Sequence, residues 1–239
     1  MQNEEPTYHG VVDIGNTSVK MAVFRNREID LFVQSSHSDW KNQWQALSSA
    51  RPIKKCVFSN VSDPQLGPGD GWMEFLSKGP SGRIGKYQFT GNLGKDRVAA
   101  MFGGISIVSA THFLVVDLGS CVTYNWVKDA ELRGLAISPG RAMRWRAMHD
   151  YTARLPLLNA SDKYEFKSFT TEDNLWMGGH QAWIIEVLGM IKFFQKLHPI
   201  DEILITGSDA VYLKDFLTEN MKIVEHLNLV GMNNWLYEN

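Results

Sequence analysis

The sequence predicts an α/β protein built from two related halves. Two segments carry this prediction: "VVDIGNTSVKMAVF" (residues 11–24) and "VVDLGSCVTYNWV" (residues 115–127). In each, an apolar strand runs into an aspartate and a glycine, passes through small polar residues and returns as a second strand. With Asp13 aligned to Asp117, both halves have the same order of strand, Asp-x-Gly turn, strand, strand and helices. This order indicates an internal duplication, and we place its halves at residues 1–108 and 109–239.

Hydrophobic periodicity predicts the elements of the first half. The two strands around the first aspartate are followed by predicted strands in "REIDLFVQ" (27–34) and "KCVFSNV" (55–61). Between them, Trp40, Trp44 and Leu47 share one face of a helix predicted over residues 39–50. A Gly/Pro-rich loop comes next, and a second helix is expected around Val98.

The second half repeats this pattern. Strands are predicted in "HFLVVDLG" (112–119), "TYNWV" (123–127), "ELRGLAI" (131–137) and "DEILIT" (201–206). The segment "SPGRAMRWRAMHDYTARL" predicts a helix with Pro139 just inside its start. A strongly apolar helix is expected from Trp183 to Leu197.

Composition limits the class of protein. The chain has 239 residues, of which 44% are hydrophobic and 21% charged, as in ordinary globular proteins. Its net charge of −2 argues against a nucleic-acid or membrane partner. The two cysteines, Cys56 and Cys121, make a disulfide framework unlikely. No signal peptide is expected, and the longest apolar helix contains Glu186 and Lys192, so we expect a cytoplasmic protein without membrane spans.

The paired Asp-Gly turns are the chemically informative feature. A single Asp-Gly hairpin is more often a simple turn. Two copies at matching places are different, because glycine and small side chains let backbone N–H groups approach an anion closely. A carboxylate beside that anion needs a cation between them. The pattern therefore favours a nucleotide together with a metal ion.

Several motifs in a fixed order resemble one family. They are "DIGNTSVK" (13–20), "LGKDRVAA" (93–100), "DLGSCVT" (117–123), "GLAISPG" (134–140), "RLPLL" (154–158), "TTEDNLWMGG" (170–179) and "TGSDA" (206–210). This set resembles the superfamily of acetate and sugar kinases, actin and chaperone ATPases, and within it the type III pantothenate kinases. The resemblance implies a duplicated actin-like/ribonuclease H-like ATPase fold, with two mixed-sheet halves around a nucleotide cleft.

The same resemblance implies a function. It is the ATP-dependent phosphorylation of pantothenate to 4'-phosphopantothenate, the first step of coenzyme A biosynthesis. The implied cofactors are ATP, magnesium and a monovalent cation, potassium or ammonium. A homodimer is also implied, with the substrate pocket near the subunit interface.

Residue roles follow from the matched motifs. Asp96 would be the general base, and Arg97 would grip the substrate carboxylate with paired hydrogen bonds. Asp117 would hold the monovalent cation, and Asp13 would organise magnesium indirectly. The implied substrate-binding residues are Tyr87, Gly94, Lys95, Asp96, Arg97 and Thr171, the last from the partner subunit. The implied ATP-binding residues are Asp13, Ile14, Gly15, Asn16, Thr17, Ser18, Val19, Lys20 and Ser120.

Simpler interpretations stay open for some of these residues. Asp96 and Arg97 alone would be a surface ion pair, Tyr87 a half-buried tyrosine, Lys20 a solvated lysine and Thr171 a helix N-cap. The sequence also departs from the family at several positions. Cys121 replaces a usual alanine, and "YQFTGN" lacks the proline often found before the substrate motif. Serine replaces the usual threonine at Ser120, and Ser208 replaces a common glycine, where it could crowd the adenine site.

Two further motifs resemble sites of other functions. A P-loop in "SGRIGKY" is rejected, because Pro80 and Tyr87 stand at its required Gly and Ser/Thr positions. The basic run "RAMRWR" (141–146) is typical of RNA binding, but a helix with a solvated arginine face is favoured. Two rivals remain: another small-molecule kinase or phosphohydrolase of the superfamily, and a non-catalytic regulatory relative.

Overall fold

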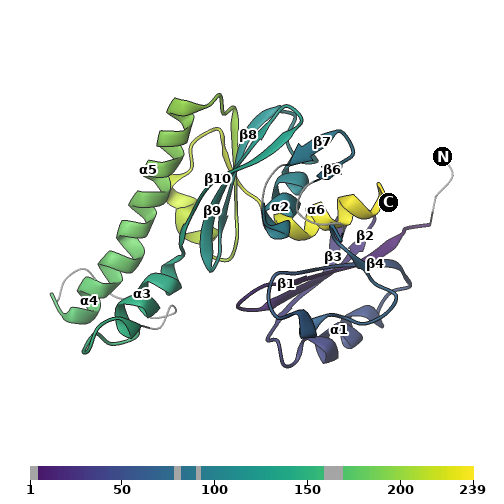
Figure 1. Ribbon diagram of the computed structural model, residues 1–239, viewed down its shortest axis with the longest axis horizontal. Helices are drawn as coiled ribbons and strands as arrows, with labels where there is room; N and C mark the ends of the chain where they lie inside the picture. The colour runs from purple at the N-terminus through teal and green to yellow at the C-terminus, as the bar shows by residue number, and fades with distance from the viewer. Residues whose placement is uncertain (1–4, 78–81, 90–92, 159–168) are drawn as a thin grey trace. The chain divides into compact units, whose positions relative to one another are not determined.

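The computed structural model describes residues 5–77, 82–89, 93–158 and 169–239, which form an α/β fold with two mixed sheets (Figure 1). The predicted fold class is therefore confirmed. Two compact units make up the chain. Unit 1 contains Met1–Thr111, Asn125–Gly134 and His226–Asn239, and unit 2 contains His112–Tyr124 and Leu135–Glu225. The proposed halves at 1–108 and 109–239 stay a prediction, because duplication and compactness are different properties.

Unit 1 is organised around a mixed sheet with the order β3-β2-β1-β4-β5. Its strands are β1 (Tyr8–Ile14), β2 (Val19–Arg25), β3 (Glu28–Ser35), β4 (Ile53–Asn60) and β5 (Met73–Glu74). The first three form antiparallel hairpins, whereas β4 lies parallel to β1. The central strand β1 is buried from its second residue onward, which fits its run of apolar residues.

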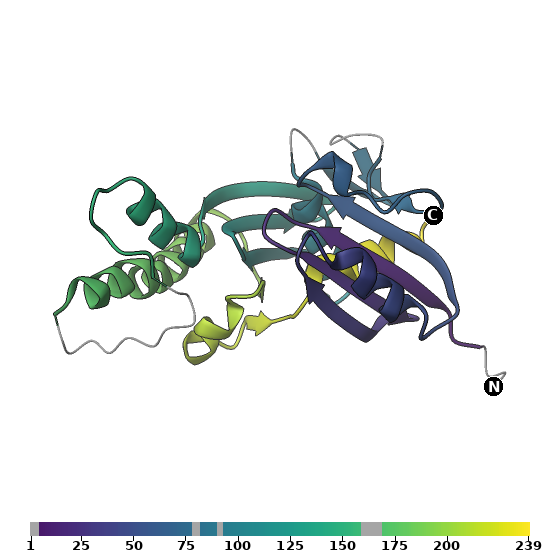
Figure 2. The ribbon, with the colours of Figure 1, turned by 90° about the horizontal axis from the view of Figure 1, so that it is seen from below.

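Helices cover both faces of this sheet. Helix α1 (Trp40–Ser48) lies on one face and α6 (Leu227–Leu236) on the opposite face (Figures 1 and 2). As predicted, α1 turns Trp40 and Leu47 inward, and they pack with Val12, Ile14, Val19, Met21 and Val23 of the first hairpin. The short 3-10 helix η1 (Pro64–Leu66) follows β4.

Two glycines let α6 lie close to α2 (Lys95–Ile105). A Cβ added at Gly231 would lie 1.8 Å from the carbonyl oxygen of Ala99. One added at Gly103 would lie 2.2 Å from the carbonyl oxygen of Leu227. The two helix backbones therefore meet without side chains between them.

The described residues also form a second sheet with the order β12-β11-β8-β9-β10-β7-β6. Its strands are β6 (Gly82–Ile84), β7 (Tyr87–Phe89), β8 (His112–Leu118), β9 (Cys121–Lys128), β10 (Glu131–Pro139), β11 (Glu202–Thr206) and β12 (Met221–Ile223). Strands β9 and β10 each begin in one unit and end in the other. Strand β11 is parallel to both of its neighbours, β8 and β12.

Unit 2 packs α5 against its strands. Trp183, Val187 and Ile191 of α5 are buried with apolar residues of β8 and β11. The helical elements of this unit are α3 (Arg141–Asp150), α4 (Thr171–Trp176), the π-helical turn η2 (Met177–Gln181), α5 (Ala182–Leu197) and the 3-10 helix η3 (Ala210–Phe216).

The start of α3 corrects one prediction. The sequence pattern predicts Pro139 just inside this helix, but Pro139 is the last residue of β10, and Gly140 is the N-cap of a helix that begins at Arg141. Proline suits the end of a strand because it cannot donate a hydrogen bond to a following ladder.

Helix length and composition bear on the membrane prediction. Among the helices of the described residues, none is both long enough and apolar enough to cross a bilayer. The cytoplasmic location and the absence of a nucleic-acid partner stay predictions from the sequence.

Candidate active site

The turn between β1 and β2 presents the first Asp-Gly motif. The backbone N–H of Gly15 donates to the carbonyl oxygen of Ser18 at 3.1 Å, which closes the turn. Asp13 lies opposite Lys20 in the antiparallel register, so both side chains leave the same face of the sheet. Asp13 is only 7% exposed, and Lys20 is half-buried.

The predicted ATP-binding residues of this hairpin differ in accessibility. Ile14 and Val19 are fully buried in the core beneath α1, so only their backbone groups could reach a ligand. Asn16 and Thr17 at the tip are exposed, and Ser18 is half-buried. Donors for an anion would therefore come from the tip and from backbone N–H groups.

Three side chains hold the hairpin in place, and none of them belongs to a sequence motif. His37 Nε2 donates to the carbonyl oxygen of Gly15 at 2.7 Å, and Gln34 Nε2 donates to the Ser18 hydroxyl at 2.8 Å. On the α6 side, Asn228 Nδ2 donates to Asp13 Oδ2. These contacts fix both the turn and its aspartate.

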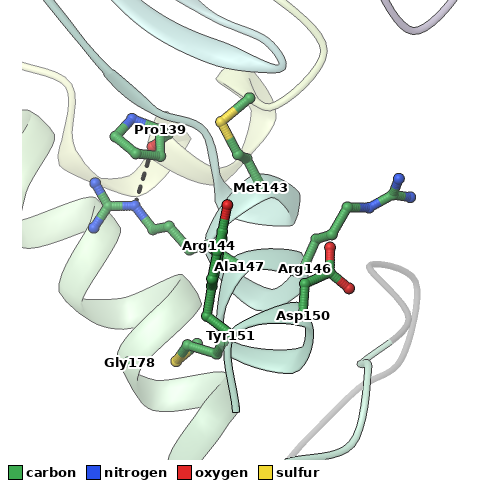
Figure 3. A pocket seen from close by; sticks show the side chains of 9 residues that line it. Pro139, Met143, Arg144, Arg146, Ala147, Asp150, Tyr151 and Gly178 are labelled. Carbon is green, nitrogen blue, oxygen red and sulfur yellow. Dashed lines mark hydrogen bonds between the residues drawn. The ribbon is translucent and has the colours of Figure 1, made fainter.

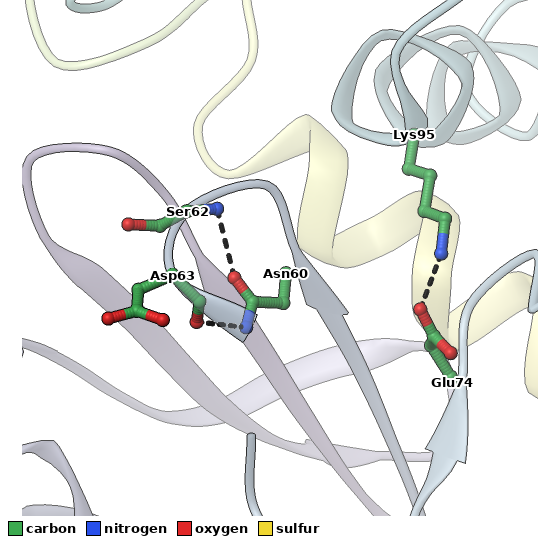
Figure 4. Close-up of polar contacts among 5 residues, drawn as sticks. All are labelled: Asn60, Ser62, Asp63, Glu74 and Lys95. Carbon is green, nitrogen blue, oxygen red and sulfur yellow. Dashed lines mark hydrogen bonds and ion pairs between the residues drawn. The ribbon is translucent and has the colours of Figure 1, made fainter. Parts of the chain in front are cut away.

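The start of α2 carries the predicted substrate loop. Gly94 is the N-cap, and Asp96 lies in the first turn, where a negative charge stabilises a helix. A Cβ at Gly94 would lie 2.5 Å from Asp96 Oδ1, so glycine leaves room for this carboxylate over the helix start. Lys95 Nζ forms an ion pair of 2.5 Å with Oε1 of Glu74 in β5 (Figure 4).

Arg97 is held by two residues outside its motif. Its Nε donates to Oδ1 of the fully buried Asn125 at 2.6 Å. A Cβ at Gly134 would lie 2.4 Å from Arg97 Nη2, so the absence of a side chain at this glycine leaves the space that the guanidinium occupies. Burial lowers the pKa of Arg97 and the charge of Asp96 raises it, but arginine stays protonated in proteins. Neighbouring Asp96 and Arg97 are therefore a carboxylate and a positioned guanidinium.

Tyr87 reaches the same helix from β7. Its ring forms a T-shaped pair with the ring of Phe102 of α2, with ring centroids 6.3 Å apart. Phe102 lies more than one helical turn beyond Arg97. Tyr87 is half-buried, as its simpler interpretation expects, and it packs on the helix that carries the substrate loop.

The second Asp-Gly turn joins β8 to β9 in unit 2. Gly119 N–H donates to the carbonyl oxygen of Cys121 at 3.1 Å. Gly140 N–H donates to the carbonyl oxygen of Ser120 at 3.0 Å, and a Cβ at Gly140 would lie 2.2 Å from the carbonyl oxygen of Gly119. The last glycine of "GLAISPG" therefore packs directly on this turn.

The loop after β11 lies against the same strand end. Thr206 pairs with Asp117 in the parallel register, and Gly207 follows with a φ of +97°. A Cβ at Gly207 would lie 2.4 Å from the Leu118 carbonyl oxygen and 2.6 Å from Asp117 Oδ1. Asp209 N–H donates to that Leu118 oxygen at 3.0 Å. Ligands of α/β proteins bind at such carboxyl ends of neighbouring parallel strands.

The helix start near Thr171 corrects another interpretation. The N-cap of α4 is Thr170, which forms a capping box with Asp173. Thr171 is the first helical residue and is exposed. Its alternative role as the N-cap is therefore wrong, while its role toward substrate stays a prediction.

The arginines of α3 do not form one solvated face. Arg146 is exposed, as expected, and Arg144 pairs with Glu186 at 2.5 Å. Arg141 is only 4% exposed, which contradicts the expectation. It contacts Asp209 and the imidazole of His180, and its guanidinium carbon lies 3.9 Å from the centre of the Tyr212 ring.

His180 makes unit 2 sensitive to acid. Burial, and to a smaller extent the positive charge of Arg141, lowers its pKa from 6.5 to about 4. The unfolded chain therefore binds a proton more readily, so stability is complete above about pH 6.5 and falls as the pH approaches about 4. The loss of unfolding free energy is at most about 3 kcal/mol.

A substitution tests this pH dependence. In urea unfolding at pH values from 7 to 4.5, we expect His180→Gln to lose less unfolding free energy than wild type. The same loss in both proteins would contradict this.

The aspartates of the two turns are the carboxylates that could hold cations. The described residues contain no cluster of three or more His, Cys, Asp or Glu side chains that could bind a metal ion alone. Mg²⁺ commonly uses one or two carboxylates together with phosphate oxygens and water. Asp13 in unit 1 fits this need. In unit 2, Asp117 lies beside the space that a Cβ at Gly207 would fill.

Sequence comparisons point to one family. The family model described as type III pantothenate kinase matches residues 79–192. A type III pantothenate kinase of Cytophaga hutchinsonii is 28% identical over 233 residues, covering 96% of this chain and 98% of the relative. Another, from Phocaeicola vulgatus, is 29% identical over 239 residues, covering 96% and 98%.

Solved structures support the fold. A Campylobacter jejuni protein described as a Baf family transcriptional activator superposes with a TM-score of 0.62 at 19% identity, covering 96% of this chain and 98% of that one. Component A of (R)-2-hydroxyglutaryl-CoA dehydratase from Acidaminococcus fermentans has a TM-score of 0.58 at 13% identity, covering 97% and 99%. At such identities the likeness concerns the fold alone.

Proposed function

We propose that this chain is a member of the type III pantothenate kinase family, which it resembles over nearly its whole length, and that it transfers a phosphoryl group from ATP to pantothenate. The product is 4'-phosphopantothenate, and the reaction is the first step of coenzyme A biosynthesis. The observation that carries the proposal is the start of α2, where Asp96 lies beside a guanidinium that Asn125 holds in place. Pantothenate offers a hydroxyl to the first group and a carboxylate to the second.

Asp96 is proposed as the general base. Phosphoryl transfer needs a hydroxyl placed in line with the γ-phosphate and a carboxylate that accepts its proton. Arg97 would bind the pantothenate carboxylate with two parallel hydrogen bonds, which orients the hydroxyl. Tyr87 and Thr171 would complete the substrate site. Lys95 would act through its ion pair with Glu74, which steadies the loop.

ATP and its cations would bind at the two Asp-Gly turns. Backbone N–H groups and the polar tip residues of the first hairpin would cradle phosphate oxygens, and Lys20 would add a positive charge. Asp13 would hold magnesium through water, and Asp117 a potassium or ammonium ion. The cations neutralise the negative charge of the phosphates. The residues of the chain would fix the orientation of ATP, and Ser120, three residues after Asp117, would offer a hydroxyl.

ADP release tests this function. Purified protein is mixed with ATP and magnesium, with and without pantothenate, in potassium and in sodium buffers. We expect release only with pantothenate, and faster release in potassium. Release that ignores pantothenate would instead identify a phosphohydrolase. ATP binding without turnover in any cation would identify a regulatory relative.

A substitution at Gly134 tests whether the position of the Arg97 guanidinium matters for binding pantothenate. In Gly134→Ala the added methyl group would collide with the end of the guanidinium, a flexible group that can shift without unfolding the protein. Because the guanidinium would leave its position, we expect the KM for pantothenate to rise about tenfold, with the KM for ATP unchanged. Gly67→Ala is the control, since its Cβ meets only an ordinary contact at 3.8 Å. Equal KM values for pantothenate in both variants would contradict the proposed role of Arg97 in binding this substrate.

We also propose that the chain acts as a homodimer. Unit 2 has a groove of about 640 Å³ along α3, lined by side chains that include Met143, Ala147 and Tyr151 (Figure 3). Met143 is 41% exposed and Tyr151 is 89% exposed, so this apolar surface is available to a second copy. Thr171 would then reach the substrate of the partner. Sedimentation equilibrium at micromolar concentration tests the dimer, and a single monomeric species would contradict it.

A further inference from the structure

We propose that Arg141 is a positioning residue that holds the loop Gly207–Asp209 in the shape that receives ATP. This inference rests on the proposed function, because it assigns that loop to the nucleotide. Arg141 comes from the start of α3, where the basic run predicts a solvent-exposed side chain. Its burial therefore needs a reason.

Both Nη atoms of the Arg141 guanidinium have polar partners, and two aromatic rings lie against the group. Nη2 pairs with Asp209 Oδ1 at 3.4 Å, and Nη1 donates to His180 Nδ1 at 3.4 Å. The guanidinium carbon lies 3.9 Å from the centre of the Tyr212 ring and 5.2 Å from the centre of the Trp145 ring. A planar group with several donors can make all of these contacts at once, whereas a lysine ammonium cannot.

Because Arg141 is buried, its positive charge needs a partner nearby. A buried charge is costly unless a partner offsets it, and removing one partner leaves the other uncompensated. Asp209 is the carboxylate that offsets the charge of Arg141. His180 lies beside Arg141 as a neutral acceptor, because its pKa is lowered by burial. Arg141 and Asp209 are therefore expected to act as one unit.

Asp209 connects Arg141 to the nucleotide loop. Its backbone N–H is bonded to the Leu118 carbonyl oxygen, next to Asp117, and its side chain is bonded to Arg141. Gly207, two residues earlier, already fits closely against the same strand end. The path of the loop is thus set on its backbone side by β8 and on its side-chain side by Arg141.

The residue before Arg141 connects it to the second Asp-Gly turn. Gly140 packs on the carbonyl oxygens of Gly119 and Ser120. One short segment, Gly140–Arg141, therefore contacts both the turn that carries Ser120 and the loop that carries Asp209. Its geometry sets the spacing between these two loops of unit 2.

The experiment is calorimetric titration of ATP, with magnesium and without pantothenate, into wild type, Arg141→Met, Arg141→Lys and Asp209→Asn. Methionine keeps the apolar stem and removes the charge. We expect Arg141→Met to raise the Kd for ATP about tenfold, and lysine to recover only part of that loss. The double variant Arg141→Met/Asp209→Asn should bind no more weakly than Arg141→Met, because the two residues act through each other.

Two readouts separate positioning from general stability. In the Arg141 variants, the KM for pantothenate at saturating ATP should stay within about twofold of wild type. The ATP titrations are made well below the Tm of each variant. Lys222→Met is the matched control, because it breaks an exposed ion pair with Glu202 in the same unit. It should leave the Kd for ATP unchanged.

The outcomes are distinct. An unchanged Kd for ATP in Arg141→Met overturns the inference, even if its Tm falls. If Arg141→Met does not fold, an unchanged Kd in both Arg141→Lys and Asp209→Asn overturns it. Wild type that binds ATP but does not phosphorylate pantothenate refutes the proposed function and leaves this inference standing. Wild type that does not bind ATP overturns both.

Discussion

Asp96→Asn is expected to lower kcat by about 10²- to 10⁴-fold, the usual contribution of a positioned general base. Asparagine has nearly the shape of aspartate, so it fits the same space beside Gly94. Its amide cannot accept the proton that the pantothenate hydroxyl loses. The defect should therefore appear in kcat at saturating substrates, whereas the Kd for ATP should be unchanged.

The measurement is steady-state ADP release at saturating ATP and pantothenate, with the ATP titration as the binding readout. Asp70→Asn is the matched control, because Asp70 is an exposed loop aspartate of the same unit. It should keep wild-type kcat. A loss smaller than about tenfold in Asp96→Asn would remove this carboxylate from the role of base.

Gly231→Ala should produce the largest loss of stability in unit 1. The added methyl group would lie 1.8 Å from the Ala99 carbonyl oxygen and 2.8 Å from the Gly103 nitrogen. Both are backbone atoms of α2, so no rotamer change can relieve the overlap, and α6 must move away. We expect the free energy of unfolding to fall by about 3 kcal/mol.

Urea unfolding measures this loss. Gly189→Ala is the control, since Gly189 is also inside a helix but a Cβ there meets nothing within 4 Å. Alanine should stabilise that helix by about 0.5–1 kcal/mol. Two variants with the same stability would show that the close packing of α2 and α6 is not needed.

Elements with strong local patterns were predictable. Strands β1 and β8 each carry an apolar run that leads into an Asp-x-Gly turn, and α1 shows a clear helical period. Helix α6 was not predicted. Its sequence, "LNLVGMNNWL", contains a glycine and three asparagines, which are poor helix formers. Nearly all of its residues are buried, so packing in unit 1 must decide its structure.

The candidate site was predictable only where residues fall within motifs. Asp13, Asp96 and Asp117 follow local patterns, and the structure places each at an exit from a strand or a helix start. The residues that support them follow no local pattern. Asn228 lies 215 positions from Asp13, and Asn125 lies 28 positions from Arg97. Their side chains acquire partners only through the tertiary fold.

Arg141 shows a different limit of prediction from the sequence. Three arginines within six residues predict a solvated helix face, because most arginines are exposed. The exception depends on partners from η2, from η3 and from the loop before η3, all of which come later in the sequence. Charge patterning alone cannot reveal such partners.

The place of α6 in unit 1 has a consequence for biosynthesis. Residues 112–225 separate the first segment of this unit from His226, and the ribosome must translate them before α6 exists. At about 5–20 residues per second, this takes roughly 6–23 seconds. During that time α2 lacks its partner, and the Asp13 carboxylate lacks Asn228. The nascent first segment therefore exposes apolar surface that a chaperone can bind until translation reaches α6.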